Sequence, residues 1–110
     1  MRDGSWRHAL KGALERGDTR PFDKLAQLPF SQMTTLDIAQ SMAIVEWLES
    51  QPGALVKFHR SLRRSAPQPP ARLYLDGNER QRANDNAFQA AVGMGFRQAD
   101  AEWKQWFRSL

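Results

Sequence analysis

One apolar run, bounded by a helix start signal and a helix stop signal, constrains the fold of this chain more than any other feature. Thr34 precedes the run and Asp37 follows three residues later, which resembles a capping box with Asp in place of Glu. Pro52 and Gly53 come directly after the run and break a helix. The sequence therefore predicts a helix over residues 35–50.

This helix is apolar over so much of its circumference that it belongs at the centre of a bundle, with only Glu46 and Glu49 facing water. Ser41 falls within its most apolar arc, as either a small spacer between helices or a reactive group. A nucleophilic serine needs a base within reach, and Asp37 is the only ionisable group one turn away. We therefore interpret Ser41 as a spacer that returns a hydrogen bond to the Asp37 carbonyl. Ser41→Leu is then expected to cost about 1–3 kcal/mol through overpacking.

Helical spacing of apolar residues recurs in four further segments. The stripes are Trp6, Leu10, Ala13 and Leu14; Leu55, Phe58 and Leu62; Ala87, Phe88, Ala91 and Val92; and Phe96, Ala99, Trp103, Trp106, Phe107 and Leu110. Residues 21–27 form at most a short helix, because prolines begin and follow them. A Pro-rich loop is predicted over residues 65–72, within an exposed insertion over residues 65–83. No segment alternates as a strand does, so we predict an all-α, compact bundle of about five helices around the helix at 35–50.

The chain of 110 residues has the size and composition of a single helical domain, with 41% hydrophobic and 25% charged residues. Without cysteine it forms no disulfide and no thiolate metal site. No apolar run approaches the ~20 residues that cross a bilayer, and the first residues lack the apolar stretch of a signal peptide. We expect a soluble chain, cytoplasmic or, where an export signal lies upstream, exported.

The positive charge is concentrated in one segment. Lys57, Arg60, Arg63, Arg64 and Arg72 occur with no acid between them, while the whole chain carries a net charge of +4. One interpretation is a solvated helix end, where cations complement the helix dipole. The other is an anion-binding face made by Lys57, Arg60, Arg63 and Arg64.

Residue types that catalyse reactions or hold metals are not grouped into a recognisable site. His8 and His59 lie far apart and neither has a second histidine one turn away, so we predict no catalytic residue and no metal ligand. The tryptophans lie on amphipathic stripes, where core packing is the usual role. Trp103 and Trp106 would stack on nucleic-acid bases only if they were exposed. The residues predicted to act in packing are Gln40, Ser41, Trp47, Trp103 and Trp106.

Five segments follow one another in an informative order: PFDKLAQLPF, IAQSMAIVEWL, PGALVKFHRSL, AFQAAVG and DAEWKQWF. Over about residues 22–110 this order resembles the C-terminal helical part of peptidase MA-like domains, the gluzincin-type zinc metallopeptidases. In that group a Gln-Ser pair opens a long apolar helix and a glycine begins the next. A short Ala-Phe helix ending in glycine then precedes a Trp-containing helix. The matching positions here are Gln40 with Ser41, Gly53, Ala87 with Phe88 and Gly93, and Trp103 with Trp106.

The resemblance implies that zinc chemistry belongs to another half of the protein. Family members hydrolyse peptides with a zinc held by a His-Glu-x-x-His helix and a downstream glutamate. This chain lacks that motif, so the zinc-binding half would precede Met1 and no cofactor is expected here. Where such domains usually carry a tyrosine, this chain has Ile38, which offers no phenol to stabilise an oxyanion. A parent protein would therefore be a zinc metallopeptidase or an inactive relative.

These features lead to one expectation and two rivals. We expect a non-catalytic helical subdomain that packs against a catalytic half or a partner protein and exposes an apolar patch where that partner docks. The alternative is a small basic adaptor that binds nucleic acid or anionic membrane through the helix at 57–64. A stand-alone hydrolase that uses Ser41 is the third hypothesis.

Overall fold

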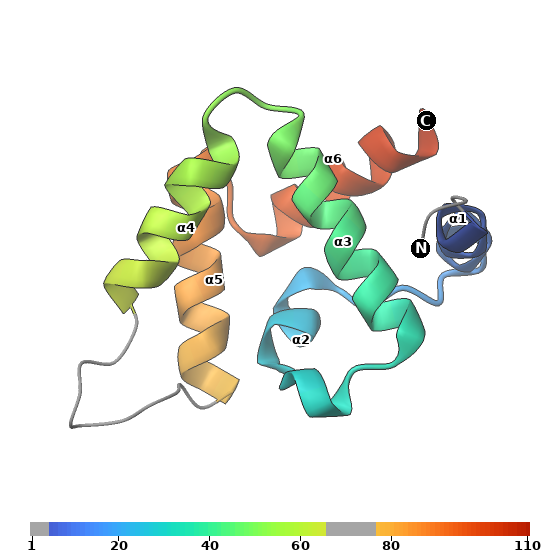
Figure 1. The fold of residues 1–110 in the computed structure, drawn as a ribbon, viewed down its shortest axis with the longest axis horizontal. Helices are drawn as coiled ribbons and strands as arrows, with labels where there is room; N and C mark the ends of the chain where they lie inside the picture. Colours follow the sequence, from blue (N-terminus) through green and yellow to red (C-terminus); the bar gives the residue numbers. More distant parts are fainter. Residues whose placement is uncertain (1–4, 66–76) are drawn as a thin grey trace.

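The structure, a computed structural model, describes residues 5–65 and 77–110, and all regular structure within them is helical (Figure 1). The prediction of an all-α fold is therefore confirmed. The described elements are α1 (Ser5–Arg16), α2 (Phe22–Gln27), the 3₁₀-helix η1 (Phe30–Gln32), α3 (Thr35–Glu49), α4 (Ala54–Ser65), α5 (Gly77–Val92) and α6 (Phe96–Arg108). The predicted Pro-rich loop lies outside the described residues, apart from Ser65 at the end of α4.

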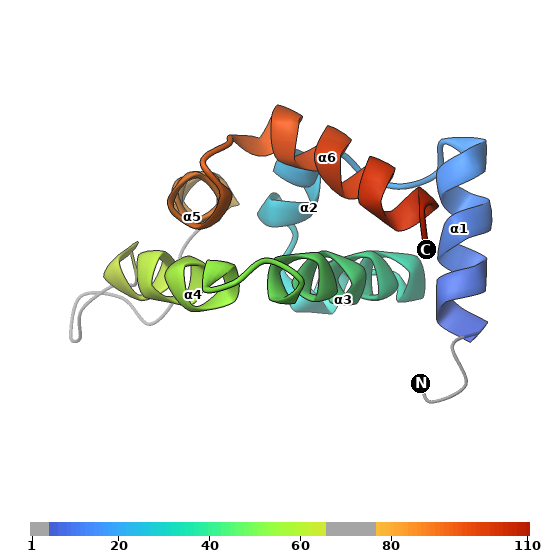
Figure 2. The same cartoon turned by 90° about the horizontal axis from the view of Figure 1, so that it is seen from above.

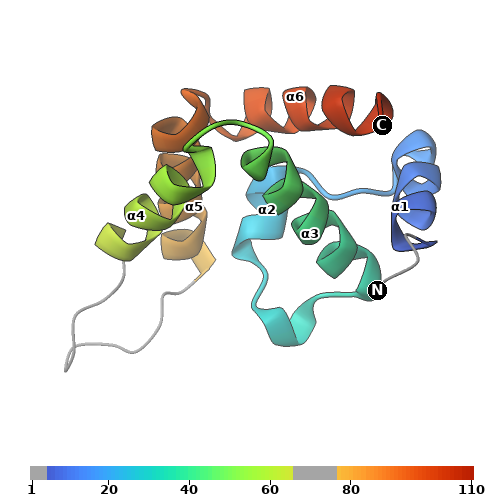
Figure 3. The ribbon, with the colours of Figure 1, turned by 45° about the horizontal axis from the view of Figure 1, so that its top comes forward.

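The helices form two layers with α1 across one end. Seen from above, α3 and α4 follow one another in one layer, and α5 and α6 lie over them in the other, with α2 between the layers (Figure 2). In Figure 3 the paired helices α4 and α5 lie at one end of the molecule and α1 at the other, with α3 and α6 between them. One side of the α3–α4 layer therefore packs on the rest of the chain, while no described element covers its other side.

The central helix α3 begins where the sequence predicts, because its capping box forms. The Thr34 Oγ1 accepts a hydrogen bond from the Asp37 N–H at 3.1 Å, and the Asp37 Oδ2 accepts one from the Thr34 N–H at 2.9 Å. These two bonds satisfy backbone donors that the first turn of a helix leaves without partners. The predicted helix over residues 35–50 is observed as Thr35–Glu49, with Ser50 as C-cap.

The hydrophobic core lies between the layers and under α1. Trp103 and Phe107 of α6 are fully buried and stack with their ring centroids 5.6 Å apart. Leu10 of α1 and Leu48 of α3 are also buried, so helices distant in sequence meet in one cluster. Gly17 follows α1 with a φ of 74°, a left-handed conformation that favours glycine.

The prediction of an exposed insertion over residues 65–83 is wrong for residues 77–83. Helix α5 already begins at Gly77, ten residues before the predicted stripe at Ala87. Ala83 and Ala87 are buried and give α5 a narrow face of small side chains, against which α4 packs closely, with its Ser61 also buried. Alanines among polar residues give a weak apolar signal, so periodicity alone missed the first half of this helix.

Two further predictions are wrong at surfaces that no described helix covers. α3 is not surrounded, because Met42 and Val45 are 36% and 42% exposed and Glu46 and Glu49 are not its only wet edge. The terminal stripe also stops early, since α6 ends at Arg108 and Leu110 is 55% exposed. A two-layer arrangement leaves an outer side on every helix, whatever its composition.

Candidate functional site

Ser41 lies at the wall of a cavity and not between tightly packed helices. Its hydroxyl donates a hydrogen bond to the Asp37 carbonyl at 2.9 Å, as the sequence predicts. However, the side chain is only half-buried and lines a cavity of about 270 Å³ between α2, α3, α4 and α5. The expectation of an enclosed spacer is therefore wrong, because the neighbouring helices leave space beside this residue.

This cavity is mainly apolar. Its apolar lining comes from four helices and from loop residues on either side of η1: Phe22, Leu25, Ala26, Leu28, Met33, Ile44, Val45, Leu48, Leu55, Phe58 and Phe88. Its polar lining is Ser41, His59, Arg80 and Asn84. Asn84 donates to the Arg80 carbonyl at 2.9 Å within α5, whereas Arg80 donates to the Gln27 carbonyl at 2.8 Å and so joins α5 to α2. The cavity suits an apolar group better than a polar one.

Ser41 and His59 line the same cavity, yet they do not form a nucleophile and its base. The Ser41 proton is already donated to the Asp37 carbonyl, and no hydrogen bond joins Ser41 to His59 in the described part of the chain. A serine is activated when its proton is accepted by a base that a third group orients. The exposed imidazole of His59 has no described carboxylate bound to it.

Exposed apolar side chains lie on α3 and α4, the two helices that supply part of the cavity wall. On α3, Ile38 is half-buried and Met42 and Val45 are exposed. On α4, Val56 is 56% exposed. We refer to Ile38, Met42, Val45 and Val56, together with the cavity that Val45 lines, as the α3–α4 face. Apolar surface of this kind, gathered around a cavity, is typical of an interaction site.

The candidate anion-binding residues lie beside the α3–α4 face. Lys57, Arg60, Arg63 and Arg64 are all exposed on α4, and no carboxylate within residues 5–65 and 77–110 forms an ion pair with them. Arg63 lies one helical turn beyond the cavity-lining His59, and Arg60 lies one turn beyond Val56. Lys57 and Arg64 lie further round the helix. The fifth cation of this segment, Arg72, is outside the described residues.

The opposite side of α3 is held by polar contacts that the sequence did not reveal. Gln40 is fully buried, accepts a hydrogen bond from the Arg20 N–H at 3.1 Å and donates one to the Arg20 carbonyl at 2.7 Å. The Arg20 guanidinium donates to the buried carboxylate of Asp37 at 2.7 Å. Three bonds thus fasten the α1–α2 connection to α3. A Gln on the inward side of an apolar helix was the one sequence signal for this contact.

The pKa of Asp37 reflects competing effects. Burial by itself raises the pKa of this carboxyl, but hydrogen bonds from Thr34 and from the Arg20 guanidinium outweigh it. The net result is a pKa below the ordinary value for Asp. Asp37 is therefore held as a carboxylate in the folded protein, and the charged form contributes to stability.

The tryptophans take the packing positions that their stripes suggest. Trp6, Trp47 and Trp103 are buried, and Trp106 is half-buried beside Phe107, with ring centroids 6.4 Å apart. Because Trp103 is fully buried, it offers no face on which a base could stack.

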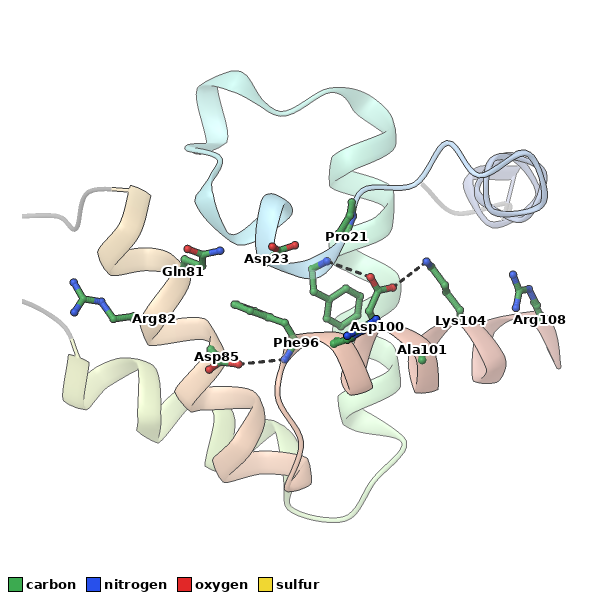
Figure 4. A pocket seen from close by; sticks show the side chains of 12 residues that line it. Pro21, Asp23, Gln81, Arg82, Asp85, Phe96, Asp100, Ala101, Lys104 and Arg108 are labelled. Atoms are coloured by element: carbon green, nitrogen blue, oxygen red, sulfur yellow. Dashed lines mark hydrogen bonds and ion pairs between the residues drawn. The ribbon is translucent and has the colours of Figure 1, made fainter.

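A second hollow lies on the other side of the molecule, between α2, α5 and α6, with a volume of about 870 Å³ (Figure 4). Two of its carboxylates hold the first residues of helices. The Phe96 N–H of α6 donates to Asp85 at 3.2 Å, and the Phe22 N–H of α2 donates to Asp100 at 3.4 Å. Lys104 also lies 3.4 Å from Asp100. These acids complement helix N-termini, and this role explains their positions in the hollow.

The described residues include neither a candidate metal site nor a helix that could span a membrane. Residues 5–65 and 77–110 contain no group of three or more His, Asp or Glu side chains that could hold a metal ion. None of the helices described is long and apolar enough to span a membrane. No protein-family model matches the chain, and searches of curated proteins and of solved structures find no match either.

Proposed function

We propose that this chain is a non-catalytic helical subdomain that docks on a protein through the α3–α4 face, and that this protein is the catalytic half of a gluzincin-type peptidase or of an inactive relative. The exposed apolar surface of the chain's most apolar helix carries the proposal. Met42 and Val45 project from α3 beside an apolar cavity that no described segment fills. Removing such apolar surface from water lowers the free energy, so binding of a partner there is favoured.

The order of the helices agrees with the order of segments on which the proposed lineage rests, although Ala87 and Phe88 lie in the 16-residue helix α5 and not in a short helix. Gly53 precedes α4, and Gly93 ends α5 with a φ of 72°. The Gln-Ser pair lies on α3 and the Trp-containing segment forms α6, the order that the peptidase MA-like resemblance implies. Because Ser41 has its proton committed and Ile38 provides no phenol, the proposal assigns chemistry to the partner.

The first experiment is to read the genomic sequence on both sides of the segment that encodes residues 1–110. The proposal expects a reading frame, continuous with this one or adjacent to it, that encodes a His-Glu-x-x-His helix and a downstream glutamate, or a degenerate form of that motif. Flanking sequence without any relic of this motif would contradict the peptidase lineage.

The second experiment is to co-express that flanking polypeptide with this chain and measure their affinity. Val45→Glu should weaken binding by about tenfold or more, because it places a charge in a buried apolar contact. Leu110→Glu is the matched control, since Leu110 is also exposed and apolar but lies at the end of α6. If the two substitutions weakened binding equally, the α3–α4 face would not be the docking surface.

Catalysis by the chain alone would also contradict the proposal. A panel of peptides incubated with this chain and added zinc should show no turnover above that of buffer. Turnover that Ser41→Ala abolishes would instead support the stand-alone hydrolase.

The exposed cations of α4 favour a second candidate function, a basic adaptor for nucleic acid or anionic membrane. Lys57, Arg60, Arg63 and Arg64 form no described ion pair and point to solvent. Phosphate binding by such residues weakens steeply with salt, with a log–log slope of about −0.9 per neutralised phosphate on B-DNA. Binding of a DNA duplex or of anionic vesicles, measured at two salt concentrations, tests this candidate. Absence of binding at low salt would eliminate it.

A further inference from the structure

We infer that the α3–α4 face recognises a partner segment of defined chemistry: an apolar side chain that enters the cavity, flanked by acidic side chains that meet Arg60 and Arg63 of α4. This inference rests on the proposed function and specifies which kind of protein segment docks. It follows from two features that lie side by side, an apolar cavity and a basic border.

The cavity has room for one large side chain. Its volume is about 270 Å³, whereas an apolar cavity of about 150 Å³ in another protein is sufficient to bind benzene. Phe22, Leu25 and Phe88 are buried residues among those that line it. Ile44, Leu48 and Leu55 supply aliphatic side chains to the walls. A leucine or phenylalanine side chain of a partner therefore finds mainly apolar contacts.

Charge is distributed unequally across the mouth of the cavity. On the α3 side the acids one turn beyond Met42 and Val45 are Glu46, which pairs with Arg7, and the exposed Glu49. On the α4 side Arg63 follows the cavity-lining His59 by one turn, and Arg60 follows the exposed Val56 by one turn, so Arg63 borders the cavity lining and Arg60 borders the exposed apolar side chain of Val56. A segment that crosses from α3 to α4 then meets positive charge on the α4 side. Acidic residues at that end of the segment complement it.

A protein segment fits these features better than a bilayer or a nucleic acid. Apolar groups that insert into a bilayer project from a surface, whereas the apolar cavity of the α3–α4 face is concave. Single-stranded nucleic acids stack on exposed aromatic rings. None of the α4 side chains described as exposed is Phe, Tyr or Trp. A cavity bordered by charge instead suits an anchor side chain with charged neighbours.

The test uses two fluorescent synthetic peptides that carry the same Leu and Phe residues at helical spacing, one flanked by Glu and the other by Lys. Their affinities for the full chain are measured at low and at physiological ionic strength. The Glu peptide should bind about tenfold or more tightly than the Lys peptide at low salt. Its advantage should shrink as salt screens the charges.

Three variants then locate the binding site. Arg60→Glu with Arg63→Glu should abolish the preference for the Glu peptide, and Val45→Glu should weaken the binding of both peptides. Arg82→Glu with Arg97→Glu is the matched control, since it makes the same change in net charge at exposed residues of α5 and α6. The control should keep most of the preference. Circular dichroism of each variant confirms that its helical content is unchanged.

The outcomes separate this inference from the proposed function. Equal binding of the Glu and Lys peptides, or an equal loss of preference in the Arg82/Arg97 control, would overturn the acidic specificity. Both results leave docking through the apolar face intact. A DNA duplex or phosphatidylserine vesicle that binds more tightly than the Glu peptide, with no effect of Val45→Glu, would overturn the inference and favour a phosphate surface.

Discussion

The two sides of α3 differ in how completely the rest of the chain covers their side chains. On the inner side Ala43, Trp47 and Leu48 are buried, and the polar Gln40 has hydrogen bonds to both backbone groups of Arg20. On the outer side Met42 and Val45 are exposed beside a cavity. The apolar side chains of the inner side pack in the core, whereas no described part of the chain covers the apolar side chains of the outer side. The comparison shows that a single helix contributes both to the core and to the exposed apolar surface on which the docking proposal rests.

The largest expected effect belongs to the core. Trp103→Ala should lower the free energy of unfolding by about 3–5 kcal/mol, because it removes a fully buried indole and leaves a cavity. Val45→Ala, on the outer side of α3, should change it by less than about 0.5 kcal/mol. Urea denaturation followed by circular dichroism measures both values. Similar losses for the two variants would abolish the distinction between the inner and outer sides.

The polar contact of the inner side gives the next effect. Gln40→Leu should cost about 2–3 kcal/mol, because the Arg20 N–H and carbonyl lose their partners in a part-buried place. Gln98→Leu provides the control at an exposed position of α6, with an expected change within about 0.5 kcal/mol. If Gln40→Leu were as stable as the parent chain, the hydrogen bonds between Gln40 and Arg20 would not contribute to stability.

Asp37 predicts a pH dependence with a definite sign. Its folded-state pKa lies below its unfolded value, so the stabilisation is present above the unfolded pKa and is lost as the pH falls through the folded pKa. Asp37→Asn should therefore cost about 1 kcal/mol at neutral pH. The difference from the parent chain should shrink below about pH 4. Denaturation curves between pH 7 and pH 2 measure it, and a difference that grows on acidification would show the opposite sign.

Ser41 gives the smallest effect and sharpens the comparison. Because its side chain faces a cavity, Ser41→Leu should change the free energy of unfolding by no more than about 1 kcal/mol. A tightly enclosed spacer would instead give a loss of roughly 1–3 kcal/mol. Thermal and urea denaturation distinguish the two. A loss above about 2 kcal/mol would mean that the helices close around residue 41.

The sequence predicted helix ends well where the interactions that fix them involve residues close together in the chain. The capping box of Thr34 and Asp37 and the glycine after α1 are satisfied within a few residues, so their sequence is sufficient. The first half of α5 was not predicted, because its buried face consists of Ala83 and Ala87 and is buried only where α4 packs against it. Small residues become core only when another helix packs on them.

The candidate site was predicted in part, and the failures have a common cause. The sequence could identify the cations of α4 and the apolar run of α3, since both are contiguous. It could not reveal the cavity, which needs side chains from α2, α3, α4 and α5 to be brought together. For the same reason it placed Ser41 between packed helices. Which side of an all-round apolar helix stays uncovered depends on the number of layers, and periodicity does not encode that number.

Oxidation of Met42 by hydrogen peroxide, measured by mass spectrometry, tests most directly whether the α3–α4 face docks a protein. Met42 is 36% exposed in the free chain and should oxidise readily. In the complex with the polypeptide of the flanking reading frame, Met42 should be protected, while the half-buried Met94, outside this face, should oxidise at its previous rate. Equal oxidation of Met42 in the free chain and in the complex would contradict the account.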